Sequence, residues 1–299
     1  MDLRHLRCFL AVAEELHFSR AAERLHIEPS PLSRTIKELE EELGVPLFKR
    51  DRRRTTLTHP GQIFRDEVRR VFASLDHAIQ SVDAAASGYR ATLRIALSDN
   101  VAQPRLATIL ARCREVSPDI DVRLIEVPLT DQLRGLRDDT FDAGFSRSAD
   151  VGAAIVAQPL WLEPLAVTVP SRHPLLIHKE IPLEELLQYP LVMCHPDSCV
   201  GCNREVQRIL RSAQTEPEIV EHVSSLDVML TLVAAGYGLG FATMEQLALC
   251  RHPDIVTRPL GVEGSALTTY LLTPDIEPSP QLGGFIDRVM ECAENGGEV

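Results

Sequence analysis

The sequence contains no run of 18 or more apolar residues, which excludes a membrane-spanning helix. A short apolar stretch begins at Cys8 but ends at Glu14 and Glu15 without a small-residue cleavage pattern, so no secretory signal peptide is predicted. Seven cysteines in 299 residues are too few and too scattered for the disulfide framework of a secreted domain. We therefore expect reduced thiols and a cytoplasmic protein without a membrane partner.

Common catalytic motifs are also missing. The sequence has no Gly-x-Ser-x-Gly elbow and no His-Glu-x-x-His pair. Gly236, Gly238 and Gly240 superficially resemble a nucleotide-binding loop, but they follow a helical pattern and precede a strand pattern, the reverse of a dinucleotide fingerprint. They predict a tight helix-to-strand turn. We expect neither an enzyme nor a bound cofactor.

Charge is distributed unevenly along the chain. The net charge of −12 looks unfavourable for a nucleic-acid partner, yet residues 1–58 contain 11 Lys and Arg against 10 Asp and Glu. Within that segment the acidic residues gather at 38–42 and the basic residues at 49–54. A local basic face is what a phosphate backbone senses within a Debye length, so the N-terminal segment remains a candidate DNA-binding domain.

Three short helices are predicted in this segment. Leu3, Leu6, Phe9, Leu10 and Ala13 recur at helical spacing and indicate a first helix. A second is expected over residues 19–25 with Ser19 as its cap, and a third opens at Ser30, has Pro31 in its first turn, and ends at Gly44. The third helix buries Leu32, Ile36, Leu39 and Leu43 and presents Ser33, Arg34 and Lys37 outward. This order is typical of a helix-turn-helix.

A basic hairpin and a long helix follow. Lys49–Arg54 precedes Thr55–Thr58 and predicts an arginine-tipped wing, although such a run is also common in a merely solvated loop. Apolar residues then alternate at four- and three-residue steps, which indicates a helix that pairs with a second copy of itself. These residues are Phe64, Val68, Val71, Leu75, Ala78, Val82 and Ala85.

After Gly88 the pattern changes to alternating strands and helices, which is typical of an α/β fold with two doubly wound lobes and a cleft. The predicted strands are Leu93–Leu97, Val122–Val127, Phe141–Phe145, Leu165–Val169, Leu191–Cys194, Ile219–Val223, Gly238–Ala242 and Tyr270–Thr273. The helical patterns between them include Leu106–Arg114, Leu133–Arg137, Glu205–Leu210 and Leu226–Ala235. We expect a winged helix-turn-helix at 1–58, a linker helix at 59–88 and a sensor domain at 89–299. Its first lobe covers about 91–162 and 268–299, and its second about 163–267.

The residues of these segments resemble the LysR-type transcriptional regulators. The N-terminal signature lies in Leu16–Leu25, Pro31–Glu40, Leu43–Phe48 and Arg53–Gly61, and Phe141–Phe145, Arg172–Leu175 and Val233–Gly240 follow in family order. Phe145–Arg147 and Thr130–Gln132 are similar to members that regulate aromatic-compound catabolism. The resemblance implies a periplasmic-binding-protein-like sensor domain, a dimer through the linker helix that assembles into a tetramer, promoter DNA and a small-molecule effector as partners, and RNA polymerase as a possible one.

The expected DNA contacts lie on the second and third helices and the wing. Arg34 can grip guanine bidentately and Lys37 a base or a phosphate, while the alternative is a solvated face paired with Glu38 and Glu41. Where family members have Ser-Gln-Pro, this chain has Glu28-Pro29-Ser30, which puts the base preference in question. The predicted set is Ser19, Arg20, Ser30, Pro31, Ser33, Arg34, Lys37, Arg50, Arg52, Arg53 and Arg54.

The expected effector contacts lie where strands end, because ligands of such folds bind outside the carboxyl ends of strands. Arg147 would pair with an anionic effector, or alternatively form an interdomain salt bridge. The predicted set is Ser98, Asp99, Asn100, Thr130, Arg147, His195, Cys199, Cys202 and Asn203.

Three cysteines in this region leave a second input open. Cys194, Cys199 and Cys202 could line the pocket without special chemistry, act as a redox or electrophile sensor, or bind a soft metal. A single Cys-x-x-Cys is a weak zinc signal, and we predict no metal site. The remote alternative for the whole chain is an enzyme or a solute-binding protein.

Overall fold

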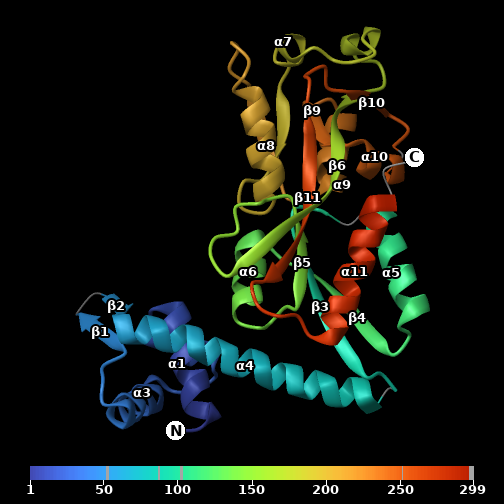
Figure 1. Cartoon of the computed structure of the whole chain (residues 1–299). Coiled ribbons are helices and arrows are strands. Elements are labelled where there is room, and N and C mark those ends of the chain that lie inside the picture. Colours follow the sequence, from blue (N-terminus) through green and yellow to red (C-terminus); the bar gives the residue numbers. More distant parts are fainter. Residues whose placement is uncertain (52–53, 87, 102–103, 251, 296–299) are drawn as a thin grey trace. The chain divides into compact units, whose positions relative to one another are not determined.

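The computed structural model describes residues 1–51, 54–86, 88–101, 104–250 and 252–295. The chain forms two compact units, residues 1–80 with 138–140 and residues 81–137 with 141–299 (Figure 1). The division falls inside one long helix. Among the described residues, no helix is both long and apolar enough to cross a membrane.

The first unit is a small helical domain with a β-hairpin. It comprises α1 (Leu3–Glu15), α2 (Phe18–Arg24), α3 (Pro29–Leu43), β1 (Phe48–Asp51), β2 (Arg54–Leu57) and the start of α4 (His59–Ala86). Phe9, Ala21, Leu32, Ile36 and Leu39 are almost fully buried and form its core. The helical spacing of these residues therefore predicts the face that each helix buries.

The ends of the helices follow capping rules, with two differences from the sequence expectation. Ser19 does not cap α2; His17 does, because its ring Nδ1 accepts the backbone N–H of Arg20 at 3.4 Å. Helix α3 begins at Pro29 rather than Ser30, and Glu28 occupies the cap position without a side-chain hydrogen bond. Gly44 ends α3 in the left-handed region, with φ of 72°, as predicted.

Strands β1 and β2 form the expected antiparallel hairpin, in which Phe48 pairs with Leu57. The Phe48 ring packs against Phe9, with centroids 5.4 Å apart, and fixes the hairpin to the core. Of the predicted wing contacts, Arg52 and Arg53 lie outside the described residues, as do the side chains of Arg50 and Arg54.

The predicted apolar seam of α4 has two parts. Phe64 and Val68 pack into the core of the first unit. Val71 and Val82, further along the seam, are 44% and 69% exposed. Among the described side chains, the exposed apolar residues of the predicted seam therefore lie in its later part.

The second unit is an α/β domain. Its strands are β3 (Ala91–Leu97), β4 (Ile120–Glu126), β5 (Ala143–Ser146), β6 (Ile155–Pro170), β7 (Leu191–Cys194), β8 (Ile219–Val223), β9 (Leu239–Thr243), β10 (Ile255–Pro259) and β11 (Ala266–Pro274). Its helices are α5 (Pro104–Val116), α6 (Leu129–Arg137), the 3₁₀ turn η1 (Pro174–Ile177), α7 (Leu183–Leu186), α8 (Val200–Leu210), α9 (Leu226–Ala234), α10 (Met244–Leu249) and α11 (Pro280–Asn295).

These strands follow one path, β4-β3-β5-β11-β6-β9-β7-β8, with β10 also paired to β6. Strand β6 joins two lobes, because its first part, from Ile155, pairs with β11 and its last part, to Pro170, pairs with β9 and β10. Strands β3, β4 and β5 are parallel in one lobe, and β7, β8 and β9 in the other. The first part of β6 and the whole of β10 were absent from the sequence expectation.

Each lobe has its own apolar core. Ile95, Phe145 and Phe285 are fully buried in the first lobe, and Leu165 and Ile181 in the second. The turn after β3 of the first lobe lies against the start of α8 in the second, since hydrogen bonds join Asn100 to Cys199 and Gly201 to Asp99. The segment after β5 is joined to α8 by Arg204, whose Nη1 donates to Asp150 Oδ2 at 3.1 Å. The carboxyl ends of parallel strands from both lobes therefore meet in one region between the lobes.

Candidate functional site

Helix α3 presents the basic surface that the sequence predicts. Because Leu32, Ile36 and Leu39 face the core, the side chains of Arg34 and Lys37 point outward and are 83% and 73% exposed. Ser30 and Pro31 are exposed in the first turn, and Ser33 is half-buried. Ser19 and Arg20 are exposed near the start of α2, where Arg20 donates to the backbone carbonyl of Glu15 at 2.8 Å.

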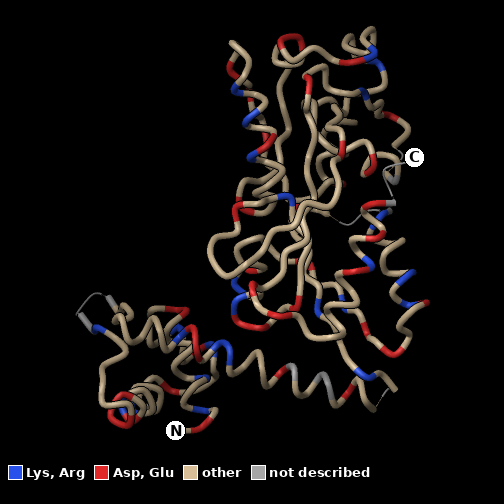
Figure 2. Tube along the Cα trace, in the orientation of Figure 1, with Lys and Arg blue, Asp and Glu red and all other residues tan. Residues whose placement is uncertain are grey.

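Arg34 and Lys37 both have an acidic partner one turn along. Arg34 Nε is 2.9 Å from Glu38 Oε1, and Lys37 Nζ is 3.3 Å from Glu41 Oε1. Figure 2 shows acidic residues along the later part of α3. Such exposed pairs contribute about 0–1 kcal/mol each. Both cations can therefore exchange these carboxylates for phosphate or base edges at little cost.

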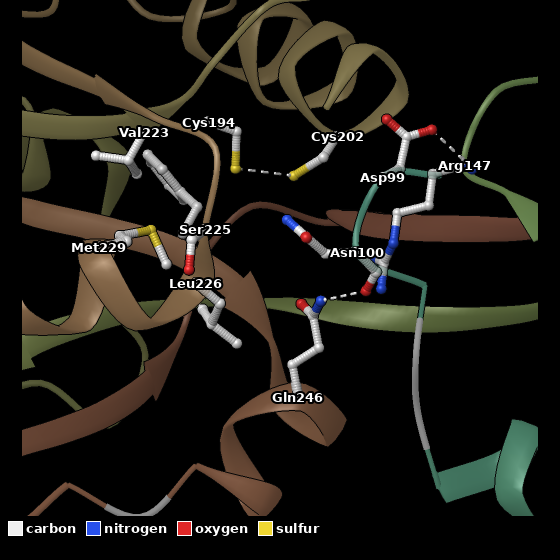
Figure 3. Close-up of a pocket in the computed structure, with 11 residues that line it drawn as sticks. Asp99, Asn100, Arg147, Cys194, Cys202, Val223, Ser225, Leu226, Met229 and Gln246 are labelled. Atoms are coloured by element: carbon white, nitrogen blue, oxygen red, sulfur yellow. Dashed lines mark hydrogen bonds between the residues drawn. The ribbon is translucent and has the colours of Figure 1, made fainter. Parts of the chain in front are cut away.

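A cavity lies between the two lobes of the second unit (Figure 3). Asp99 and Asn100 reach it from the turn after β3, Arg147 from the end of β5, and Cys194 and Cys202 from β7 and α8. The centres of water molecules can occupy only ≈ 20 Å³ of it, which is room for one or two waters. The remaining lining residues are Val223, Ser225, Leu226, Met229, Phe241 and Gln246.

Beside this cavity, the Asp99 carboxylate is hydrogen-bonded by residues of both lobes. Its Oδ2 accepts hydrogen bonds from the Ser146 hydroxyl at 2.9 Å and from the Arg147 backbone N–H at 3.2 Å. Its Oδ1 accepts a hydrogen bond from the Gly201 backbone N–H at 2.9 Å. Asp99 and Asn100 both lie in the left-handed region, with φ of 55° and 54°. Asparagine and aspartate tolerate that conformation better than most residues. The negative carboxylate at the N-terminus of α8 also complements the helix dipole.

Arg147 is the most distinctive group of the cavity. Its side chain is 1% exposed and lies 3.4 Å from Glu163, which is fully buried on β6. This contact is an ion pair without hydrogen-bond geometry, and Nε, Nη1 and Nη2 of Arg147 have no hydrogen-bond partner among the described residues. Glu163 Oε2 accepts the Thr269 hydroxyl at 3.0 Å. Buried charged donors without partners carry a large desolvation penalty, so this guanidinium is suited to an added acceptor.

Four of the predicted effector contacts line the cavity, and five do not. Asp99, Asn100, Arg147 and Cys202 line it. Ser98 is buried and its hydroxyl donates to Asp99 Oδ2 at 3.4 Å, and Cys199 is buried with its Sγ accepting Asn100 Nδ2 at 3.2 Å. Thr130 is exposed in the first turn of α6, His195 is half-buried in the turn after β7, and Asn203 donates to the Cys194 carbonyl at 2.7 Å.

Sequence reasoning missed the lining residues after β8 and on α9, β9 and α10. The strand Ile219–Val223 was predicted, and its carboxyl end leads directly to Ser225 and Leu226. The strand-end rule could therefore have found these two. Gln246 could not be found in this way, because it reaches the cavity from a helix, where its Nε2 donates to the Asn100 carbonyl at 2.9 Å.

The three cysteines of this region lie close together. Cys194 Sγ is 3.6 Å from Cys202 Sγ, and Cys199 Sγ accepts Asn100 Nδ2 at 3.2 Å. Hydrogen bonds to Cys199 and Cys202, together with burial, raise the pKa of Cys194, whereas the hydrogen bond with Cys194 lowers the pKa of Cys199. Within the described residues, no group of three His, Cys, Asp or Glu side chains is arranged to hold a metal ion.

Both parts of the chain match known families. Residues 3–62 match the bacterial regulatory helix-turn-helix protein family of lysR type, and residues 86–293 match the LysR substrate binding domain. The HTH-type regulator YnfL of Escherichia coli is 32% identical over 289 residues, 95% of this chain and 96% of YnfL. BenM of Acinetobacter baylyi is 32% identical over 241 residues, 80% of this chain and 79% of BenM.

A solved structure of similar architecture is full-length CbnR, a LysR family regulator, in complex with its target DNA. It has a TM-score of 0.72 and 26% identity, and the match covers 98% of this chain and 100% of CbnR. The relatives are regulators rather than enzymes. The winged helix-turn-helix, the two-lobed α/β domain and these matches agree: the chain belongs to the LysR family of DNA-binding transcriptional regulators, with an effector-binding domain behind its helix-turn-helix.

Proposed function

We propose that this regulator binds a small carboxylate in the cavity between its sensor lobes, and that this binding changes its affinity for promoter DNA. The DNA contacts in this proposal come from α3 and the wing of two paired chains. The exposed apolar side chains of α4, including Val71 and Val82, pair the two chains. Assembly into a tetramer and contact with RNA polymerase are further expectations of the resemblance.

The single observation behind the effector proposal is the guanidinium of Arg147. It is buried, it lies at the cavity wall, and three of its nitrogens have no hydrogen-bond partner among the described residues. A carboxylate presents two oxygens to such a planar donor fork. Glu163 reduces the local charge without accepting those hydrogen bonds in good geometry. A bound carboxylate would supply the acceptors that are missing.

The opposite end of the cavity favours an apolar body on that carboxylate. Figure 3 shows Val223 and Met229 across the cavity from Arg147, and Leu226 and Phe241 also line the cavity without charge. A short hydrocarbon or a single aromatic ring attached to the carboxylate fits this division into a polar and an apolar end. Aromatic acids and muconate-like diacids are therefore the first ligands to test, in agreement with the resemblance to regulators of aromatic catabolism.

Binding must also open the cavity, because the free space holds only one or two waters. The lobes are joined by a few hydrogen bonds, including Asp99 to Gly201 and Gln246 to Asn100. A ligand with higher affinity for the more open arrangement shifts the equilibrium toward that arrangement. The size of the shift is set by the difference between its affinities for the two arrangements. This shift is the proposed signal to the DNA-binding domain.

A thermal-shift screen of the full chain tests the proposal. Benzoate, cis,cis-muconate and phenylacetate should raise the melting temperature, while benzamide, which has the same ring without the charge, should not. The Arg147→Ala variant should lose this response, and Arg172→Ala, which removes an exposed arginine of the second lobe, should keep it. A response to benzamide equal to that to benzoate, or full retention in Arg147→Ala, would overturn the carboxylate assignment.

Promoter binding needs a separate test. The full chain should bind a duplex from its own neighbouring promoter more tightly than a random duplex at the same salt concentration, since phosphate contacts alone do not discriminate sequence. A saturating carboxylate from the screen should then change that promoter affinity. Equal binding to both duplexes would contradict sequence-specific recognition by α3.

A further inference from the structure

A pair of thiols forms part of the same cavity wall and is unused by carboxylate binding. Cys194 ends β7 and Cys202 lies in the first turn of α8, and both line the cavity. Their sulfur atoms are 3.6 Å apart, and Figure 3 shows the two side chains pointing toward each other. A disulfide needs a separation of about 2.05 Å, so a modest side-chain movement would join them.

We propose that Cys194 and Cys202 form an oxidisable dithiol, which a small hydroperoxide converts to a disulfide, giving the regulator a redox input at its effector cavity. Access is provided by the cavity itself, since both sulfurs belong to its lining. The proposal concerns the same cavity as the proposed carboxylate site. The thiol chemistry, however, requires no bound carboxylate.

The reaction consumes one hydroperoxide and two thiols. The sulfur of Cys202, as thiolate, attacks one peroxide oxygen and the O–O bond breaks. The alkoxide, or hydroxide where hydrogen peroxide is the oxidant, leaves and takes up a proton to become an alcohol or water. The resulting sulfenic acid is attacked by the Cys194 sulfur, the S–S bond forms, and the hydroxyl group leaves as water with the thiol proton. The two sulfurs together lose two electrons, which reduce the peroxide.

The hydrogen bonds of the cluster support this division of roles. The pKa of Cys194 is raised, so this sulfur is held as a thiol and is not the one that attacks the peroxide. It lies 3.6 Å from Cys202 Sγ, where it can meet the sulfenic acid formed there. Cys199 is 1% exposed, does not line the cavity and is hydrogen-bonded by Asn100 from the other lobe. It is therefore less accessible to the oxidant than Cys202.

The bond would also alter the contacts between the lobes. Cys194 loses its thiol proton on joining the disulfide, and with it the interaction that lowers the pKa of Cys199, the sulfur that Asn100 contacts. The neighbouring Gly201 donates to Asp99 from the same first turn of α8 that holds Cys202. Pulling Cys202 toward β7 would displace that turn, so oxidation should change promoter affinity.

Mass spectrometry of the full chain tests the bond. After treatment with hydrogen peroxide, which is small enough for the cavity, and alkylation of the remaining thiols, trypsin releases residues 180–204, which contain Cys194, Cys199 and Cys202 together. We expect this peptide to lack two hydrogens and to hold one alkyl group, on Cys199. Cys202→Ser should abolish the oxidised form, whereas Cys113→Ser, which alters a buried cysteine of α5, should not.

Three results would overturn the proposal. Alkylation of all three cysteines after oxidation would exclude the disulfide, and an alkyl group on Cys202 would assign the bond to Cys194 and Cys199 instead. Promoter binding measured before and after oxidation completes the test, because unchanged affinity would remove the redox input even if the bond forms. Failure of every carboxylate in the thermal-shift screen would leave the oxidised peptide unaffected, so the two proposals fail separately.

Discussion

The carboxylate of Asp99 accepts the backbone N–H of Gly201 at 2.9 Å, and this hydrogen bond joins the first lobe of the sensor domain to the start of α8 in the second. Gly201 also lies against Arg147: a Cβ atom at position 201 would be 2.5 Å from the Arg147 carbonyl carbon and 2.6 Å from its oxygen. The lobes can approach this closely only because residue 201 has no side chain.

Substitution of Gly201 should therefore separate the lobes. In Gly201→Ala the new methyl group would push the start of α8 away from the Arg147 backbone. Overpacking of this kind lowers the free energy of unfolding by about 1–3 kcal/mol. Gly283→Ala, on α11, is the matched control, since its Cβ would meet nothing within 4 Å and alanine is the better helix former. Urea unfolding of both variants gives the free energies. Equal stability of the two variants would show that the contact between Gly201 and Arg147 is not restrictive.

The Asp99 carboxylate can be tested without changing its size. Asp99→Asn has only one acceptor oxygen, so its amide N–H₂ must face either the Gly201 N–H or the donors of Ser146 and Arg147. Hydrogen bonds to charged groups contribute about 1.5–3 kcal/mol each, and we expect a loss of this order in the free energy of unfolding. Asp275→Asn, an exposed position on the same domain, should change it little.

Much of the first unit can be predicted from local signals. The spacing of Leu32, Ile36 and Leu39 fixes the buried face of α3, and therefore the outward direction of Arg34 and Lys37. Gly44 marks the end of that helix because it adopts a positive φ. The cap of α2 was mispredicted since serine is the commoner cap, whereas here the His17 ring takes the role.

The long strand β6 shows where local signals fail. Pro159 and Pro164 interrupt its first part, and proline disfavours the middle of a sheet. The structure accommodates Pro159 beside a register irregularity in β11, between Thr269 and Tyr270. Prediction of the cavity is limited in the same way. The ends of strands indicate Asp99 and Arg147, but the ion pair of Arg147 with Glu163 depends on the part of β6 that was not predicted.

Arg34 should contribute sequence discrimination. Arg34→Ala should weaken binding to the promoter duplex by about fivefold to more than a hundredfold, since a bidentate contact to guanine contributes roughly 1–3 kcal/mol. Binding to a random duplex should fall much less. Arg123→Ala, which removes an exposed arginine on β4 of the sensor domain, is the control and should bind both duplexes normally. An equal loss on both duplexes would reassign Arg34 to a phosphate contact.

His173 should make the sensor domain less stable in mild acid. Burial lowers the pKa of its ring below the usual 6.5; the ring packs edge-on against Tyr189 and accepts the Leu175 N–H at 3.3 Å. The unfolded chain then binds the proton more readily than the folded one, so this stability is present above about pH 6.5 and is lost as the pH falls toward the folded-state pKa. His173→Gln should reduce the drop in unfolding midpoint between pH 8 and pH 5, whereas His222→Gln, at an exposed position, should retain it.

Glu163 should set a balance between stability and carboxylate affinity. Glu163→Gln keeps the side-chain volume and an oxygen for the Thr269 hydroxyl, but it leaves the buried Arg147 charge uncompensated. Breaking a buried ion pair in this way costs about 3–5 kcal/mol, so the melting temperature of the free protein should fall. A carboxylate then becomes the main counter-charge for Arg147, and benzoate should stabilise this variant more than it stabilises the wild type.

Thr269→Val serves as the comparison, because it removes the hydroxyl contact to Glu163 and leaves both charges in place. If benzoate stabilised Glu163→Gln less than it stabilises the wild type, Glu163 would be helping to orient the ligand rather than competing with it for Arg147.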